Sequence, residues 1–536
     1  MCIAIWMTVG LFGRQPYKPD EAYTIGLVKS VVETGDWVVP RLVGEPFMEK
    51  PSLFFVVAAG FSKWLPWLPM HEAARFAVVL FVAVGLWAIA ACARELYGAG
   101  SGRLAALLTL ATVGTVARMH QLITDTGLFA GVALALLGLV KAPRQPGLAG
   151  VALGLGLAIA FLTKGLLGPG LIVCTTLALL AHPAWRGSSM IRACMIATAI
   201  AVPLAACWLV PLYLRAPDQL HVWFYDNNLG RFFGLNALGP KKDMLFYGRT
   251  LTWYAQPCLP LALWGWSRAV QGDRTAPAQP GRAAPAAFLI VSLVVLTLAS
   301  DGRELYALVL VPALAVAALD GLLALPIELE RRLAIGVAAV FGILAALLLC
   351  AYAAAVEWPA ATARLPADIA MPGMVSASRD ALALYAVITC AILVCLAPLR
   401  RPLRGALPLA GAAGIALLWA TLVLPWGQYL DALKGYREVA RSLEPHLPAA
   451  GCIASRGLGE GERALLDYYI GLRTVRMETH PAAANQCSAV LIQVRSGETD
   501  NPPAAGTLAW LGARPGSDNS SLRLYVYGAP AQVHDH

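Results

Sequence analysis

The sequence predicts an all-α polytopic membrane protein followed by a small C-terminal α/β domain. The first observation is composition: 58% of the 536 residues are hydrophobic and 14% are charged, whereas a typical soluble domain has about 25% charged residues. The second is a change near residue 426, where long apolar runs give way to polar, mixed segments. The net charge of +9 comes from short basic clusters between apolar runs, which is typical of membrane topology and argues against a DNA-binding surface.

Long apolar runs predict the membrane helices, because a span needs about 20 mostly apolar residues. We count roughly 13 such runs by that rule. They lie near residues 2–13, 74–93, 104–120, 126–140, 147–163, 166–182, 191–213, 248–267, 284–299, 304–323, 333–355, 379–397 and 405–425. The first run is short, so we expect either that the true start lies upstream or that Met1 begins inside the helix.

Basic residues predict the orientation, because Lys and Arg mark cytoplasmic loops. With the N-terminus inside, all six loops assigned to the cytoplasm are short and basic. They hold Arg94 and Arg103; Lys141 and Arg144; Arg186 and Arg192; Arg268, Arg274 and Arg282; Arg331 and Arg332; and Arg400, Arg401 and Arg404. We therefore expect a multi-pass inner-membrane protein, with a membrane domain at 1–425 and a periplasmic α/β domain at 426–536.

Two outer regions and one inner loop have structure that the sequence suggests. Within the outer loop 14–73, DEAYTIGLVKSVVETGDW reads as a short helix and PSLFFVVAAGFSKWLPWLP as a helix lying in the interface. In the C-terminal part, helix-like stretches (REVARSLEPHL, GERALLDYYIGL) alternate with strand-like ones (GCIAS, SAVLIQV, SLRLYVYG). The inner loop 268–283 is rich in Pro, Gly and Ala and is expected to be a flexible linker.

Cysteines suggest one possible disulfide. Nine of the eleven lie in or beside apolar runs, where Cys behaves as a small hydrophobe. Cys452 and Cys487 lie in the polar C-terminal part, and a disulfide between them is possible if that part is periplasmic. The sequence does not show whether the two are close, so it leaves the disulfide open.

Acidic residues at the outer helix ends are the candidate catalytic groups. Asp20 and Glu21 follow Pro19 just after the first apolar run, and Asp125 begins another helix on the same side. Carboxylates in such places can accept a proton, orient a hydroxyl or face an amine. The alternative for each is helix capping, because acids in the first turn favour the helix dipole.

Four cations share that predicted side: Lys50, Lys164, Arg231 and Arg303. A phosphate in a low-dielectric site needs such partners, and Arg can bind it through two parallel hydrogen bonds. The alternative is that each extends toward the headgroups. ATP and nucleotide sugars are not supplied outside, so a transferase there needs a donor that arrives through the membrane. A polyprenyl-phosphate sugar meets that need, and neutralising its phosphate makes it a better leaving group.

These motifs also resemble a known family. PDEAYTIGLVKSVVETGDWVVPRLVGEPFMEKP is similar to the first periplasmic loop of bacterial GT-C glycosyltransferases, in particular the lipid A aminoarabinose transferases and the protein-mannosyltransferase-like group. TDTGLF, FLTKGLLGP, NNLGRFFG and SDGRELYALVLVPALA resemble further motifs of these enzymes, so the resemblance covers about residues 1–425. It implies an inverting displacement at C1 of an undecaprenyl-phosphate-linked sugar, such as aminoarabinose, with lipid A or lipopolysaccharide as the favoured acceptor.

The resemblance also implies roles for individual residues. Asp20 would be the principal catalytic or substrate-orienting carboxylate, with Asp125 as its partner. The remaining candidates would bind substrate: Glu49 and Lys50 beside the donor phosphate, Lys50, Arg231 and Tyr306 on the carrier phosphate, Lys164 and Arg303 as further cations, and Tyr23 in the same pocket. A divalent ion is possible between two acids, but no His or Cys cluster indicates one.

The chain departs from the aminoarabinose transferases at one motif, and three alternative functions stay open. Aminoarabinose transferases often have His shortly before the Arg of the "RF" motif, where this chain has Asp226, Asn227 and Asn228, so another sugar remains open. A protein O-mannosyltransferase-like enzyme is the first alternative. A lipid-linked sugar transporter is the second, although transporters usually place charge near the bilayer midplane and show repeated halves. An assembly protein with an outer binding domain is the third. We expect a monomer that binds no nucleic acid.

Overall fold

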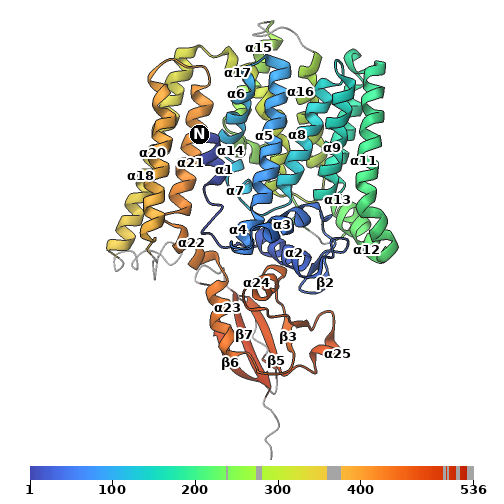
Figure 1. Ribbon diagram of the computed structural model, residues 1–536, viewed down its shortest axis with the longest axis vertical. Coiled ribbons are helices and arrows are strands. Elements are labelled where there is room, and N and C mark those ends of the chain that lie inside the picture. The colour runs from blue at the N-terminus through green and yellow to red at the C-terminus, as the bar shows by residue number, and fades with distance from the viewer. Residues whose placement is uncertain are drawn as a thin grey trace, which may run out of the picture.

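The structure is a computed structural model that describes residues 1–236, 239–272, 280–358, 376–495, 497–498, 502–503, 506–514 and 520–527. It has three layers: a bundle of long helices, a band of short helices across one end of the bundle, and a sheet domain beyond that band (Figure 1). The chain is a multi-pass membrane protein, as its composition predicted. Arg274 of the predicted linker and most of the predicted outer loop 356–378 lie outside the described residues.

Seven helices in the described part of the chain are long and apolar enough to cross a membrane. They are Met70–Tyr97 (α4 and α5), Pro146–Lys164 (α9), Ser188–Arg215 (α11), Glu304–Ala324 (η4 and α17), Ile327–Glu357 (α18), Arg379–Arg400 (α20 and η5) and Ala406–Val423 (α21). Shorter apolar helices accompany them: Leu53–Trp64 (α3), Ser101–Ala111 (α6), Leu167–Leu179 (α10) and Ala283–Leu298 (α16). The first predicted run contains only Cys2–Thr8 (α1).

Two predicted runs are interrupted helices, and the interruptions pair with each other. The run 104–120 breaks between α6 and Thr115–Arg118 (α7), and the run 248–267 breaks between Phe246–Tyr254 (α14) and Cys258–Val270 (α15). The Val113 amide donates to the Gln256 carbonyl and the Gly114 amide to the Tyr254 carbonyl, both at 2.9 Å. Broken backbone inside a bundle needs such partners because lipid supplies none.

Helix α8 (Asp125–Lys141) lies at the centre of the bundle, where all its residues except Lys141 are buried. It packs antiparallel against α9 through glycines: a Cβ on Gly131 would lie 2.6 Å from the Ala160 nitrogen, and one on Gly127 would lie 2.5 Å from the Thr163 side chain. Small residues allow such close approach of membrane helices. The packing places the start of α8 beside the end of α9.

The outer loop 14–73 forms the band of short helices. Asp20–Thr34 (α2) and α3 lie across the end of the bundle (Figure 1), as the sequence predicted. Between them, Arg41–Leu42 (β1) and Glu45–Pro46 (β2) pair as a small hairpin. Residues predicted to lie outside therefore meet at this end, whereas Lys141 at the far end of α8 forms an ion pair with Glu95 near the end of α5, 2.8 Å away.

The C-terminal part contains a five-stranded sheet of order β4-β3-β5-β7-β6. Strands β4, β3 and β5 are parallel, and β7 and β6 are antiparallel. Its elements are Gly427–Lys434 (α22), Arg437–Leu443 (α23), Ile453–Arg456 (β3), Glu460–Ile470 (α24), Val475–Arg476 (β4), Pro481–Ala484 (α25), Ala489–Arg495 (β5), Gly506–Gly512 (β6) and Ser520–Tyr527 (β7). All predicted strands and helices of this part are present. Strands β4 and β6 were not predicted.

Cys452 and Cys487, whose pairing the sequence left open, form a disulfide in the structure. The two cysteines lie just before the parallel strands β3 and β5, and the Ser488 amide donates to the Cys452 carbonyl at 3.0 Å. The disulfide therefore ties together the starts of two neighbouring strands.

The sheet domain docks on the short helices through α24, which packs against α2. A Cβ on Gly26 would lie 3.0 Å from the Ala464 Cβ, so the two helices touch closely. Lys29 in α2 forms an ion pair with Asp467 in α24 at 2.8 Å, and Arg463 pairs with Glu45 of the hairpin at 3.2 Å. The domain is thus fixed to the loop that carries Asp20 and Lys50.

Candidate active site

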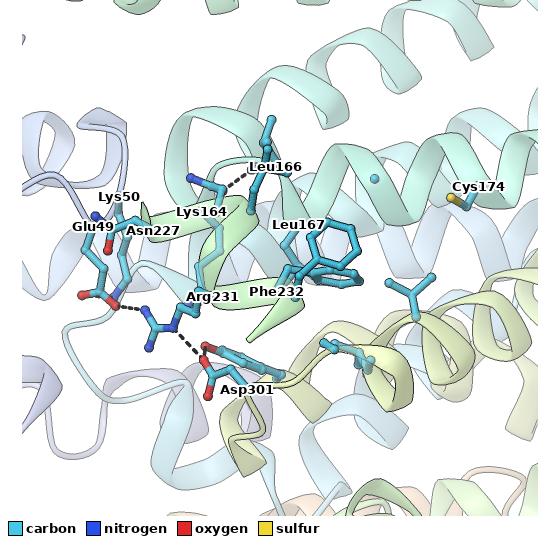
Figure 2. A pocket seen from close by; sticks show the side chains of 18 residues that line it. Glu49, Lys50, Lys164, Leu166, Leu167, Cys174, Asn227, Arg231, Phe232 and Asp301 are labelled. Carbon is cyan, nitrogen blue, oxygen red and sulfur yellow. Dashed lines mark hydrogen bonds and ion pairs between the residues drawn. The ribbon is translucent and has the colours of Figure 1, made fainter. Parts of the chain in front are cut away.

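A cavity of about 390 Å³ lies at the bundle end that faces the sheet domain, between α9, α10, α16 and the segment 222–233. Figure 2 shows its charged groups at one end, with Leu167, Phe232 and Cys174 extending toward the other. The polar lining is Glu49, Lys50, Lys164, Asn227, Asn228, Arg231, Asp301 and Tyr306, and the apolar lining includes Leu166, Leu167, Phe232, Phe233, Val295, Leu296 and Ala299. The cavity is therefore amphipathic along its length.

A short wide helix positions one wall of the cavity. Val222–Gly230 (η2) is a π-helix that runs into Arg231–Phe233 (α13). The Asn228 amide group donates to the Trp223 carbonyl at 2.7 Å, and its carbonyl oxygen accepts from the Leu166 amide at 3.1 Å. Gly165 has φ +81°, and a Cβ there would lie 2.8 Å from that oxygen. The "TKG" turn thus needs glycine. The neighbouring π-helix is of a kind that is frequent at functional sites.

Arg231 lies between two carboxylates. Its Nη1 donates to Glu49 Oε1 and its Nε to Asp301 Oδ2, both at 2.7 Å, as Figure 2 shows. Burial raises the pKa of Glu49, but Lys50 and Arg231 outweigh it and lower that pKa to about 2. Burial lowers the pKa of Arg231, but Tyr306 and Glu49 outweigh it and raise that pKa. Both groups are therefore charged at neutral pH.

Lys164 and Asp125 form the second tight pair of the site. Lys164 Nζ donates to both carboxylate oxygens of Asp125 at 2.7 Å. Lys164 Nζ also lies 5.2 Å from the centre of the Tyr306 ring, and the Tyr306 hydroxyl donates to Asp301 Oδ2 at 2.9 Å. Asp125 stands outside the cavity lining but reaches the cavity through Lys164.

Asp20 reaches the cavity through Tyr23 and Lys50. Lys50 donates a hydrogen bond to the Tyr23 hydroxyl, which donates to Asp20 Oδ1 at 2.8 Å. Arg303 Nη1 lies 3.9 Å from the same Asp20 oxygen. Asp20, Tyr23 and Arg303 stand outside the cavity lining in the described part of the chain, so they border the polar end from the side of α2.

Glu21, which the sequence offers as a catalytic candidate, does not belong to this network. It is 1% exposed and accepts from Arg14 at 2.7 and 2.8 Å, from the Leu122 amide at 3.0 Å and from the Tyr17 amide at 3.1 Å. Burial raises its pKa, but Arg14 and Arg75 outweigh burial and lower that pKa to about 2. Its oxygens are saturated by the bundle, so Glu21 holds α2 in place.

The structure adds two residues that sequence reasoning missed as site residues. Asp301 binds Arg231 and Tyr306, and Asn228 connects the π-helix to the "TKG" turn. A buried acid at the start of a membrane helix is a functional-site signal, and Asp301 stands two residues before Arg303 in the sequence. In the described residues, no group of three or more His, Cys, Asp or Glu has metal-ligand geometry.

Comparison with known proteins gives partial sequence matches. Residues 69–211 match the family described as dolichyl-phosphate-mannose-protein mannosyltransferase. The undecaprenyl phosphate-alpha-4-amino-4-deoxy-L-arabinose arabinosyl transferase of Aeromonas salmonicida (strain A449) is 28% identical over 42% of this chain and 42% of the relative. A protein of the same name from Sodalis glossinidius (strain morsitans) is 28% identical over 54% of this chain and 51% of the relative. The chain thus spans about half the length of the curated relatives it matches.

Solved structures match over nearly the whole chain. ArnT from Cupriavidus metallidurans bound to undecaprenyl phosphate superposes with a TM-score of 0.69 at 16% identity, covering 99% of this chain and 98% of that chain. The chain has the fold of ArnT. The apo state of ArnT gives a TM-score of 0.70 at 17% identity. The resemblance to GT-C glycosyltransferases that the motifs indicated is confirmed, and the ArnT fold includes both the helical bundle and the sheet domain.

Proposed function

We propose that this protein is an inverting glycosyltransferase that moves a sugar from undecaprenyl phosphate to an acceptor of the bacterial envelope. One observation carries the proposal: a single cavity joins a cluster of cations to an apolar channel (Figure 2). That combination suits a ligand with a phosphate at one end and a hydrocarbon chain at the other. The sequence relatives are named as arabinosyl transferases of an undecaprenyl-phosphate-linked sugar, which supports the same substrate class.

The two ends of the cavity would divide the donor between them. Lys50, Lys164 and Arg231 would bind the carrier phosphate. The prenyl chain would follow α10 and α16 past Leu167 and Val295 toward lipid. Cys174 on that path is exposed, which is consistent with an exit into the membrane. The donor sugar would then lie near Tyr23 and Asp20, where the polar end meets α2.

The reaction would be a displacement at C1 of the sugar. An oxygen of the acceptor donates an electron pair to C1, the bond between C1 and the carrier phosphate breaks, and that pair stays on the phosphate. The cations stabilise the charge that develops on the leaving phosphate, which is the most effective place for them. Asp20 would orient the sugar or, if the acceptor is a hydroxyl, remove its proton.

The basic loops support the remaining proposals about topology. We infer that the 13 apolar runs all cross the membrane, interrupted ones included, since each predicted run contains helix among the described residues. The cavity and the sheet domain share one end of the bundle, and the basic loop residues Lys141 and Arg144 lie at the other with Glu95. The positive-inside rule then puts the active site and residues 426–536 in the periplasm, with lipid A as the favoured acceptor.

Sugar transfer by purified protein tests the proposed function. Undecaprenyl-phosphate aminoarabinose and lipid A are the probes, and mass spectrometry of lipid A is the measurement. We expect Lys50→Ala to reduce transfer by about 100-fold or more, because it removes charge stabilisation of the leaving group. Lys63→Ala, on the exposed side of α3, is the matched control and should leave transfer unchanged.

Two results would overturn the proposed function. The first is full transfer by Lys50→Ala protein that is folded and made in normal amount. The second is movement of the lipid-linked sugar across liposome membranes by the purified protein with no sugar added to any acceptor, which would favour a transporter.

A further inference from the structure

The four cations of the site differ in how tightly they are neutralised. Lys164 and Arg231 each lie 2.7 Å from a carboxylate oxygen. Lys50 and Arg303 are both 3.9 Å from their acidic neighbours, Glu49 and Asp20 respectively. An ion pair at that longer distance lies beyond hydrogen-bond range. Lys50 and Arg303 therefore have more of their charge available for an anionic ligand than the other two cations.

These two cations occupy different places. Lys50 lines the amphipathic cavity, whereas Arg303 stands outside it beside Asp20. The Arg303 side chain is 32% exposed, yet its Nε is buried with no hydrogen-bond partner in the described part of the chain. The exposed part of the guanidinium is therefore what a ligand can reach. Arg303 can bind there an anion that does not share the donor cavity.

We propose that Arg303 binds the acceptor through a phosphate ester, beside Asp20, and not the carrier phosphate. The proposal rests on the proposed function, because inversion requires the nucleophile and the leaving phosphate to stand on opposite sides of C1. One loosely paired cation inside the donor cavity and another outside it match that requirement. The guanidinium can offer a phosphate two parallel hydrogen bonds, which an ammonium cannot.

The proposed step balances without a base. An ionised oxygen of the acceptor phosphate donates its electron pair to C1, and a new C1–O bond forms. The bond from C1 to the carrier phosphate breaks, and its electron pair leaves with that phosphate. No proton moves, so Asp20 keeps the guanidinium and the sugar in place and does not have to deprotonate the acceptor.

The proposal is tested by measuring whether the protein binds a phosphorylated acceptor more tightly than a dephosphorylated one. Full-length protein in nanodiscs, loaded with undecaprenyl phosphate, is titrated with lipid A and with its dephosphorylated counterpart. We expect the wild type to bind lipid A more tightly than the dephosphorylated lipid. Arg303→Gln should weaken lipid A binding by about 10- to 100-fold and leave the affinity for the dephosphorylated lipid unchanged. Arg303→Lys should recover part of that preference, because it keeps the charge without the planar fork.

Affinity for undecaprenyl phosphate separates this role from a carrier-binding or structural one. Arg303→Gln should bind undecaprenyl phosphate as the wild type does, which also shows that the variant folds, whereas Lys50→Ala should lose that binding and keep the preference for lipid A phosphate. Arg249→Gln, at an arginine that is 63% exposed and paired with Asp243, is the matched control for removing a positive charge.

Three outcomes would overturn the proposal. Arg303→Gln that binds undecaprenyl phosphate as weakly as Lys50→Ala would make Arg303 a carrier-binding residue. Equal losses for both forms of lipid A would make its role structural. An unchanged preference would remove Arg303 from acceptor recognition. Failure of the proposed function looks different, because the wild type would then transfer no sugar even when both lipids bind.

Discussion

Asp20 and Glu21 are neighbours in the sequence, but their side chains lie on different sides of α2. Glu21 faces the bundle, is 1% exposed and accepts hydrogen bonds from two arginines and two backbone amides. Asp20 borders the charged end of the cavity, accepts from the Tyr23 hydroxyl and has Arg303 at 3.9 Å. A carboxylate whose partners are all supplied by the protein can only hold structure together. One with unfilled acceptor capacity at a cavity edge can bind a substrate.

The largest expected effect is on folding, from Glu21→Gln. Removing one charge of a buried ion pair leaves the other uncompensated and typically costs about 3–5 kcal/mol, and here both Arg14 and Arg75 lose the carboxylate they pair with. We expect little folded protein, measured by size-exclusion profile and thermal unfolding in detergent. A stable but inactive Glu21→Gln would instead make Glu21 a functional residue and break the comparison.

The next effect is on rate, from Asp20→Asn. The amide oxygen can still accept from Tyr23, so we expect an unfolding temperature within about 2 °C of the wild type. Sugar transfer should fall by roughly 100- to 10,000-fold if Asp20 acts in acid-base chemistry, and less if it only orients the sugar. Transfer at the wild-type rate would remove Asp20 from the active site.

Low pH should destabilise the folded protein through protonation of Glu21. The pKa of Glu21 is lowered from the ordinary value of 4.5 to about 2, so its ionised form stabilises the folded state. That stabilisation is fully present above pH 4.5 and is lost as pH falls from 4.5 toward 2. We expect the unfolding temperature to drop steeply below pH 4.5, with a loss of up to about 3 kcal/mol from this group. A flat profile down to pH 3 would contradict the assignment.

The smallest effect concerns a third face of α2, which meets the sheet domain. Lys29→Ala removes the ion pair with Asp467, but Asp467 keeps Arg473 at 3.0 Å. We expect a loss of about 1 kcal/mol, seen as faster proteolysis of the C-terminal domain with nearly normal transfer. Lys63→Ala on α3 is the control. Destabilisation as large as that of Glu21→Gln would mean that domain docking, and not the buried acid, holds α2.

The gathering of these acids and cations at one end of the bundle could be predicted because lipid imposes rules that act along the whole chain. Basic loops at one end and the acids and cations at the other follow from topology, so Asp125 and Lys164 could be placed together although 39 residues separate them. The direction in which the Glu21 side chain points from α2 could not be predicted. It depends on Arg14 and Arg75, and nothing near Glu21 in the sequence indicates that those arginines reach it.

Several other structural features also could not be predicted from local sequence patterns. The breaks near Gly114 and Tyr254 are stable because each supplies hydrogen-bond partners to the other, and hydrophobicity alone does not reveal such pairing. Strand β4 has two residues and β6 is an edge strand with Leu508 and Leu511 exposed, so neither shows a clear alternating pattern. Asp301 lies within the motif SDGRELYALVLVPALA, but the resemblance implied roles only for Arg303 and Tyr306.

The glycine contacts between α8 and α9 make the site depend on atoms deep in the helical bundle. Gly131 lies six residues from Asp125, about 9 Å along the helix axis, and a methyl group there would meet the α9 backbone. Pushing the two helices apart would widen the gap between Asp125 and Lys164, which stand at adjoining helix ends. A random screen for inactive variants should therefore recover Gly131→Ala as an apparently conservative change far from any substrate.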